Sequence, residues 1–281
     1  MGQGLTLVGC GDSWAWGTEL IDPTTIDRPD WSFNLHHLPI NKKYREDHRY
    51  LKLFSDKIGA TEIVDLSQGG CSNDTIVRTL IAWLTENDYM SGRDTSGLFV
   101  SIGWTSPERK DFLFKHQLGG HTDNWLTIRP TFYQNIGYKE LEDFFNLYVE
   151  NFWHIDEYMN RWINQIWQVE VLLKSLKIKY VMHQAFYHHH EKMITNWNDI
   201  DYIETHHNKI NSTDLKLWNI IDSDRFINKN NPSIGTFHSY ISNSVGKNNH
   251  NQVIVDQHPN ALGHSIWADY MYKYCIENKL L

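Results

Sequence analysis

The sequence has few cysteines and no long hydrophobic segment. Its 281 residues include three cysteines, Cys10, Cys71 and Cys275, whose spacing matches no metal-binding motif. An odd and sparse set of thiols fits a reducing compartment better than a disulfide framework. No apolar run approaches the roughly 18 residues that a membrane-spanning helix needs. These two deficits argue against a disulfide-stapled secreted domain and exclude a transmembrane segment.

An excess of positive charge is also missing. The chain has 26 Lys and Arg against 34 Asp and Glu, which gives a formal net charge of −8. This balance argues against a protein whose main task is to bind nucleic acid phosphates. The first residues, MGQGLTLVGCGDS, lack a basic stretch followed by a long apolar one. We therefore expect no secretory signal and a cytoplasmic location.

The hydrophobic and aromatic content suffices for a large folded core. Hydrophobic residues make up 41% of the chain, and there are 12 Trp, 14 Tyr and 12 Phe. This composition excludes disordered and fibrous classes. The length fits one large domain or one domain with long insertions, and no internal repeat or linker divides it.

Short apolar runs alternate with amphipathic stretches along the chain. The predicted strands are residues 5–9, 62–66, 98–103 and 178–186. Because these runs are continuous rather than alternating, they indicate strands buried on both faces of a parallel sheet. Helices are predicted after the capping sequence Ser72-Asn73-Asp74, from about 139 to 177 with or without an interruption, and from about 260 to 279. The alternation predicts an α/β fold.

Three stretches exceed the minimal version of that plan. The stretch near 22–47 is rich in aromatic residues and histidine, that near 107–137 lacks clear periodicity, and that near 188–250 is rich in Asn, His and Ser. Loops of this length are uncommon in compact domains unless they are functional or contain hidden elements. We interpret them as insertions over one rim of the sheet, within a single domain spanning residues 1–281.

The first predicted strand leads into Gly11-Asp12-Ser13. A serine at this place lies at the carboxyl edge of a parallel sheet, where open α/β folds bind their ligands. The alternative is that Asp12 or Ser13 only caps a helix. A second segment, Asp256-Gln257-His258-Pro259-Asn260, precedes the last predicted helix. There an Asp could orient His258, and the imidazole could take the proton of a serine hydroxyl.

Together these blocks resemble the SGNH hydrolase superfamily, the GDSL-type esterases. The resemblance implies that Ser13 in Gly11-Asp12-Ser13 is the nucleophile and that the amide of Gly70 serves the oxyanion hole. It also implies that Asp256 and His258 are the acid and the base. The fold implied is a flavodoxin-like three-layer α/β/α sandwich with a parallel sheet. The blocks are correctly ordered, and each follows a predicted strand or precedes the last helix.

The chain departs from this family pattern in two places. The third block usually reads Gly-x-Asn-Asp, with the asparagine as an oxyanion donor, but here the sequence is Gly103-Trp104-Thr105. We therefore expect the Thr105 hydroxyl to supply the missing donor, although losing a well-placed donor typically costs ~10²–10³ in rate. The last block commonly reads Asp-x-x-His, whereas this chain has Asp256-Gln257-His258.

Aromatic and histidine clusters are weaker signals. Trp14, Trp16, Trp31 and Trp104 surround the predicted catalytic edge, where aromatic rings could stack on a sugar or simply belong to the core. We place Trp104 and Asp12 with Gly70 and Thr105 among the candidate oxyanion or substrate-binding residues. The tract 188–190 is three histidines, but it has no acidic or cysteine partner at a ligand spacing, so we predict no metal site.

The resulting hypothesis is a serine esterase for small acyl esters, with acetyl groups on a carbohydrate as the leading candidate substrate. It needs no cofactor, and its partner is a small-molecule or carbohydrate ester rather than nucleic acid or a membrane. One alternative is an acyltransferase that uses the same triad. Another is a non-catalytic binding or structural protein on the same fold, virion-associated if the gene belongs to a phage. The sequence does not indicate an oligomeric state.

Overall fold

The computed structural model describes residues 4–25, 38–113, 125–128, 139–185, 212–231, 234–255 and 258–281. Its centre is a four-stranded parallel sheet in the order β2-β1-β3-β6. The strands are β1 (Thr6–Cys10), β2 (Glu62–Asp65), β3 (Leu98–Trp104) and β6 (Lys179–Gln184). The predicted strands are confirmed to within two residues at each end, and the order is that of a flavodoxin-like sheet.

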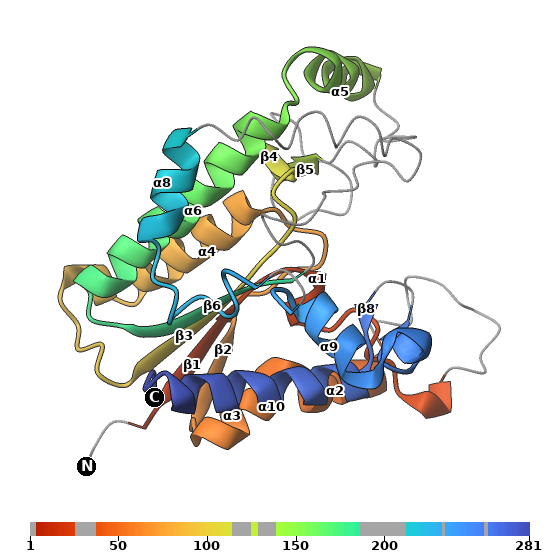
Figure 1. Cartoon of the computed structure of the whole chain (residues 1–281), viewed down its shortest axis with the longest axis vertical. Helices are drawn as coiled ribbons and strands as arrows, with labels where there is room; N and C mark the ends of the chain where they lie inside the picture. The colour runs from red at the N-terminus through yellow and green to blue at the C-terminus, as the bar shows by residue number, and fades with distance from the viewer. Residues whose placement is uncertain are drawn as a thin grey trace.

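Helices cover both faces of this sheet (Figure 1). Alternate side chains of each strand reach opposite faces, so Val8 and Val100 pack on one side, and Leu7 and Phe99 on the other. The first side carries α4 (Asn73–Glu86), α6 (Ile155–Ser175) and α8 (Ser212–Ile220). The second side carries α2 (Pro39–His48), α3 (Tyr50–Ile58), α9 (Phe237–Val245) and α10 (Ala261–Glu277). The expected three-layer α/β/α arrangement is confirmed.

The long helix expected from 139 to 177 is interrupted. It consists of α5 (Lys139–Asn151) and α6, and α6 begins after His154, whose Nδ1 accepts a hydrogen bond from the amide of Asp156 at 3.2 Å. The final helix, expected at 260–279, is α10. Asn260 caps it by accepting a hydrogen bond from the Gly263 amide at 3.0 Å.

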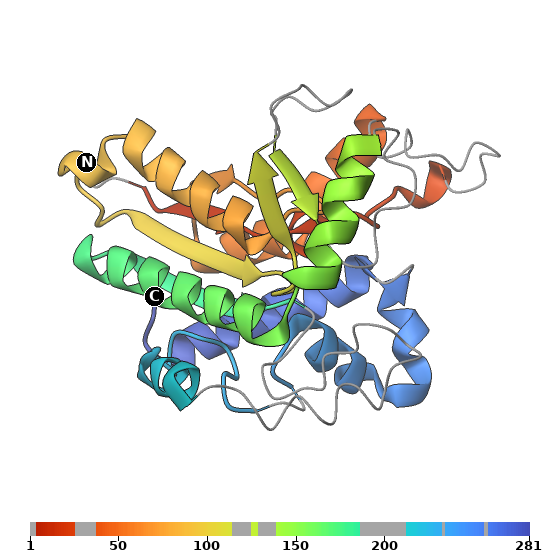
Figure 2. The same ribbon diagram turned by 90° about the horizontal axis from the view of Figure 1, so that it is seen from above.

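The three long stretches contain ordered elements. The first holds the 3₁₀ turn η1 (Pro23–Thr25) and most of α2, and its residues 26–37 lie outside the described chain. The second holds an antiparallel hairpin of β4 (Lys110–Leu113) and β5 (Trp125–Ile128). Figures 1 and 2 place this hairpin and α5 on the α4–α6 side, at the end toward which the sheet strands run.

The third stretch is more than a rim insertion where it is described. Besides α8 and α9 it holds the 3₁₀ helix η5 (Lys247–Gln252). Phe226 and Thr236 form single parallel bridges with Met182 and Gln184, so this part of the chain lies along the free edge of β6. Phe226 is buried with the α4–α6 core and Phe237 with the α3–α10 core. Residues 188–211 of this stretch are outside the described chain.

The remaining elements are short: the four-residue helix α1 (Ser13–Trp16), the 3₁₀ turn η3 (Tyr89–Ser91), and the two-stranded pair β7 (Ile254–Val255) and β8 (His258–Pro259). In the parts of the chain described here, no helix combines the length and the apolar character of a membrane span.

Candidate active site

The structure brings Ser13 and His258 together at the carboxyl edge of the sheet. Ser13 is the first residue of α1, directly after β1, and His258 is the first residue of β8. The Nε2 atom of His258 lies 2.9 Å from the Ser13 hydroxyl oxygen, within hydrogen-bond range. Ser13 is 6% exposed as a residue, and the His258 side chain is 22% exposed. This pair has the geometry of a nucleophile and its general base.

The histidine is held by the turn between β7 and α10. Val255 pairs with His258 across the short antiparallel ladder, and the amide of Asn260 donates to the Val253 carbonyl at 2.9 Å. The Asn260 side chain also donates to the Gln252 carbonyl at 2.8 Å. The turn that carries His258 is thus fixed at the cap of α10.

A close approach between two strand ends positions the serine. A Cβ built on Gly11 would lie 2.5 Å from the Ala15 side chain and 3.1 Å from the Gly103 carbonyl oxygen. Only glycine lets the turn after β1 pass this close to the end of β3. Trp14, which follows Ser13, is buried with its ring 6.3 Å from that of His258 and edge-on to Phe237 at 5.1 Å.

Asp12 is a buried carboxylate below the serine. Its Oδ1 accepts a hydrogen bond from the Trp14 amide at 2.9 Å, which caps α1. Its Oδ2 accepts from the Thr105 hydroxyl at 2.5 Å and lies 3.7 Å from Nη1 of Arg109. Burial raises the pKa of Asp12 above its ordinary value, and the Arg109 charge and the hydrogen bonds oppose that shift. Asp12 therefore caps a helix, as the alternative interpretation of the sequence expected, and it is also adjacent to the candidate nucleophile Ser13.

The position of Thr105 corrects the expectation that its hydroxyl is an oxyanion donor. The side chain is fully buried, and its one proton is donated to Asp12. The Thr105 amide donates to Oδ1 of Asn73 at 2.9 Å, and its carbonyl accepts from the side chains of Asn73 at 3.1 Å and Gln184 at 3.3 Å. Every polar group of Thr105 is therefore committed within the protein.

Gly70 stays accessible. It is exposed, and a Cβ built on it would meet nothing within 4 Å. Its loop is tied to the end of β1, because the Gln68 amide donates to the Gly11 carbonyl at 3.0 Å. Among the described residues, the amides of Ser13 and Gly70 have no hydrogen-bond acceptor. These two amides are the candidate oxyanion donors in the described part of the chain.

The tryptophans divide between core and rim. Trp104 is fully buried in the α4–α6 core, which contradicts the expectation that it contacts substrate. Trp14 is likewise buried. Trp16 is partly exposed, and the Arg45 guanidinium lies 3.9 Å from its ring centre. Trp31 lies outside the described residues.

A carboxylate that the sequence did not single out lies at the other imidazole nitrogen. Oε1 of Glu19 is 3.9 Å from Nδ1 of His258. Asp256, the acid expected from the sequence, lies outside the described residues. No sequence pattern marks Glu19, because it lies in a turn without periodicity. The only available signal is its closeness to Ser13 along the chain.

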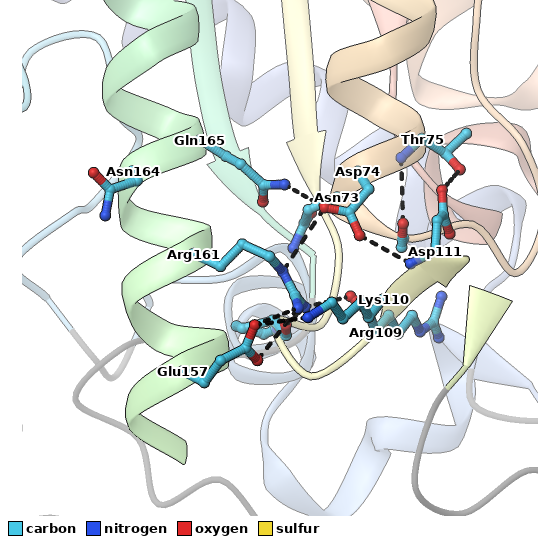
Figure 3. A network of polar contacts seen from close by, with 12 residues as sticks. Asn73, Asp74, Thr75, Arg109, Lys110, Asp111, Glu157, Arg161, Asn164 and Gln165 are labelled. Atoms are coloured by element: carbon cyan, nitrogen blue, oxygen red, sulfur yellow. Dashed lines mark hydrogen bonds and ion pairs between the residues drawn. The ribbon is translucent and has the colours of Figure 1, made fainter. Parts of the chain in front are cut away.

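A polar network ties the inserted hairpin to the layer of α4 and α6 (Figure 3). The Asp111 carboxylate accepts from Thr75 at 2.5 Å and from Arg78 at 3.1 Å, and the Asp111 amide donates to Asp74 at 2.9 Å. Arg161 donates to the carbonyl of Arg109 at 2.8 Å. The network therefore fixes the backbone of the segment that carries Arg109.

From that backbone the Arg109 side chain reaches the candidate site. Its Nη1 donates to the Cys71 carbonyl at 3.1 Å and lies beside Asp12, as described above. Arg109 thus connects the second inserted stretch to Asp12, the buried carboxylate next to Ser13.

Two histidines lie in the core below this edge. His183 and His264 are buried, and burial lowers the pKa of each to about 3. Nδ1 of His264 accepts a hydrogen bond from the Tyr50 amide at 3.1 Å, which requires that nitrogen to be unprotonated. Within the described ranges, no group of three His, Cys, Asp or Glu residues could hold a metal ion. The histidine tract at 188–190 lies outside those ranges.

Comparisons with known proteins place the chain in a family without assigning an activity. A family model described as a family of unknown function, DUF6071, matches residues 33–281, a span that begins after Ser13. No curated protein matches the chain. One similar solved structure is a mutant of Axe2, an acetyl-xylooligosaccharide esterase from Geobacillus, with 16% identity and a TM-score of 0.44. The match covers 97% of this chain and 94% of that one.

Proposed function

We propose that this chain, which belongs to the DUF6071 family, is a serine esterase that hydrolyses small acyl esters. The observation that carries the proposal is the 2.9 Å contact between the Ser13 hydroxyl and Nε2 of His258. The contact lies at the edge of a parallel sheet where α/β proteins bind ligands. A serine is a weak nucleophile unless a base removes its proton, and this contact supplies the base.

In the first half of the reaction, the Ser13 oxygen attacks the ester carbonyl while its proton moves to Nε2 of His258. The carbonyl oxygen becomes an anion, and the amides of Ser13 and Gly70 donate to it. When the tetrahedral intermediate collapses, the bond to the alcohol oxygen breaks, and His258 returns the proton to that oxygen. The acyl group remains on Ser13 as an ester.

In the second half, a water molecule attacks the acyl-enzyme. His258 takes a proton from the water, the bond to the Ser13 oxygen breaks, and the proton returns to that oxygen. A carboxylic acid leaves and the enzyme is regenerated. Both halves are redox-neutral, and the bonds that form and break are accounted for by Ser13, His258, the ester and water. With Thr105 bonded to Asp12, the described residues supply two donors to the oxyanion hole, and we expect a slow esterase.

Acetyl groups on a carbohydrate are the substrate that we propose first. The support is the family resemblance of the sequence blocks together with Trp16, whose partly exposed indole lies close to Ser13 along the chain. An apolar ring of this kind can pack on a sugar face. The cytoplasmic location remains a prediction from the sequence. An acyltransferase would use the same residues and pass the acyl group to an alcohol rather than to water.

One observation favours a binding protein instead. The Thr105 hydroxyl donates to Asp12, so the residue at the position of the family's third oxyanion donor does not serve as one. A fluorophosphonate probe separates the two possibilities, because it reacts with activated serines. We expect mass mapping to find the label on Ser13 in the wild type, and no labelling at that position in a His258→Ala variant. Absence of labelling on Ser13 in the folded wild-type protein would refute the esterase proposal.

A further inference from the structure

The turn after α1 directs Glu19 toward the candidate base. The helix ends at Gly17, which has a left-handed φ of +84° and donates to the Ser13 carbonyl at 2.9 Å. The Thr18 amide donates to the same carbonyl at 3.0 Å, and the Leu20 amide donates to Gly17 at 3.1 Å. Leu20 is buried and anchors the end of the turn. The nucleophile and Glu19 therefore belong to one short, internally bonded segment.

This turn accepts only glycine at its centre. A side chain at Gly17 would be strained at its φ, and a Cβ there would lie 2.7 Å from the Leu20 side chain and 3.1 Å from that of Arg45. The glycine at position 17 therefore fixes the backbone turn that places Glu19 beside His258.

The imidazole of His258 lies between the two groups of this segment. Its Nε2 faces the Ser13 hydroxyl at 2.9 Å, and its Nδ1 faces Oε1 of Glu19 at 3.9 Å. The Glu19 side chain is 12% exposed, so water screens its charge only in part. A hydroxyl, an imidazole and a carboxylate in this order form the arrangement of a catalytic triad.

We propose that Glu19 is the carboxylate that positions His258 and stabilises its protonated form during the reaction. The proposal rests on the esterase function above and adds a positioning residue that the sequence blocks do not contain. Glu19 does not touch the substrate, and it acts through the imidazole. A carboxylate at Nδ1 favours the tautomer that leaves Nε2 free to accept the serine proton.

The separation suits this role. At 3.9 Å the carboxylate is beyond a hydrogen bond to neutral imidazole but within ion-pair range of the imidazolium. Catalytic hydrogen bonds are often long in unliganded structures and shorten when substrate binds. Moving the proton from Ser13 to His258 creates a positive charge beside Glu19, so the attraction is strongest where the reaction needs it.

The first test reads the pairing without relying on catalysis. The pKa of His258 is measured by NMR titration in the wild type and in Glu19→Gln, Asp256→Asn and Glu46→Gln variants, with His258→Ala used to assign its signal. Asp12 and the buried His264 also interact electrostatically with His258, and none of these substitutions alters them. Glu46, on the exposed face of α2, is the matched control.

We expect Glu19→Gln to lower the pKa of His258 by about one unit, because it removes an adjacent negative charge. We expect Asp256→Asn to lower that pKa less, and Glu46→Gln to leave it unchanged. No change in Glu19→Gln, or an equal or larger change in Asp256→Asn, would overturn the assignment. Because the NMR titration does not require turnover, it tests the pairing of Glu19 with His258 even if the wild type hydrolyses no ester.

The second test reads the catalytic consequence in an active wild type. Glu19→Gln should lower kcat at least tenfold while KM for p-nitrophenyl acetate stays within about threefold, since Glu19 acts on the base rather than on the substrate. The acid limb of the pH–rate profile should move to lower pH with the His258 pKa. A fall in kcat below tenfold would overturn the catalytic role of Glu19 while leaving the esterase function intact.

Discussion

Replacing Thr105 with valine removes one hydroxyl and little else. Valine has nearly the shape of threonine, so no cavity forms in this fully buried position. The backbone amide and carbonyl of Thr105 keep their bonds to Asn73 and Gln184, which hold the end of β3 in place. The substitution therefore removes the 2.5 Å hydrogen bond to Asp12 and places a methyl group against its carboxylate.

The expected loss follows from the charge and the burial of Asp12. Its carboxylate is 1% exposed, so water cannot replace the lost donor. Hydrogen bonds to charged groups contribute roughly 1.5–3 kcal/mol, and a buried acceptor left without its donor incurs most of that amount. The Trp14 amide and Arg109 still face Asp12 and limit the loss. We expect about 2 kcal/mol of destabilisation, or a fall in Tm of about 4–8 °C.

The destabilisation should depend on pH. Burial already raises the pKa of Asp12 in the folded state, and removing the Thr105 donor should raise it further. A carboxyl group with a raised pKa in the folded state lowers the free energy of unfolding at pH values above that pKa, where it is ionised. Once the group is protonated, this loss of stability disappears. The difference between variant and wild type is therefore largest at neutral pH. It shrinks as pH falls through the raised pKa toward the ordinary value of 3.8.

Thermal unfolding across a pH series is the assay, with Thr79→Val as the control. Thr79 lies on α4 and donates its hydroxyl to backbone carbonyls, so its replacement should cost less and without pH dependence. Ester hydrolysis by Thr105→Val should fall less than tenfold. A variant as stable as wild type but a hundredfold slower would refute the reasoning, because Thr105 would then act on the oxyanion.

Two further predictions concern the core below the site. Gly11→Ala should destabilise the protein by about 1–3 kcal/mol in urea unfolding, because the new methyl group overlaps Ala15, whereas a methyl group at Gly69 meets only ordinary contacts at 3.9 Å or more and should be near neutral. If both variants unfold alike, the close approach at Gly11 does not matter. His183 and His264 are neutral when folded, with each pKa lowered to about 3 from 6.5. The unfolded chain binds protons at these histidines below pH 6.5, whereas the folded protein does not until the pH approaches 3. The free energy of unfolding therefore falls progressively as the pH drops from 6.5 toward 3. Each should therefore account for about 2 kcal/mol of lost stability between pH 7 and 5. His183→Phe should remove its share of this dependence, and an unchanged pH slope in that variant would contradict the assignment.

Much of the fold could be predicted because strands buried in a parallel sheet have continuous apolar sequences. Residues 98–103 predicted a strand, and β3 is buried at every position from Leu98 to Trp104. The strand continues one residue further than expected, and this places Trp104 in the core rather than at the rim. The apolar run does not indicate where Trp104 lies, since a tryptophan is common both in the core and at the rim of a binding site.

The candidate site was only partly predictable. Ser13 and His258 are marked by local patterns, a glycine-flanked serine after a strand and a histidine before a helix cap. The partner of the Thr105 hydroxyl depends on how the ends of β1 and β3 bring Asp12 and Thr105 together, and periodicity contains no such information. Glu19 was missed for a similar reason, because its position results from a turn rather than from a motif. The role of Asp256 stays a prediction.

The most direct test of the Ser13–His258 pair is the pre-steady-state hydrolysis of p-nitrophenyl acetate. Wild type and the exposed control Ser244→Ala should release about one equivalent of p-nitrophenol per chain in a burst, as acyl group accumulates on Ser13. Ser13→Ala should show neither burst nor turnover above the buffer rate, with its Tm nearly unchanged. A burst and turnover in Ser13→Ala equal to those of the wild type would contradict the account.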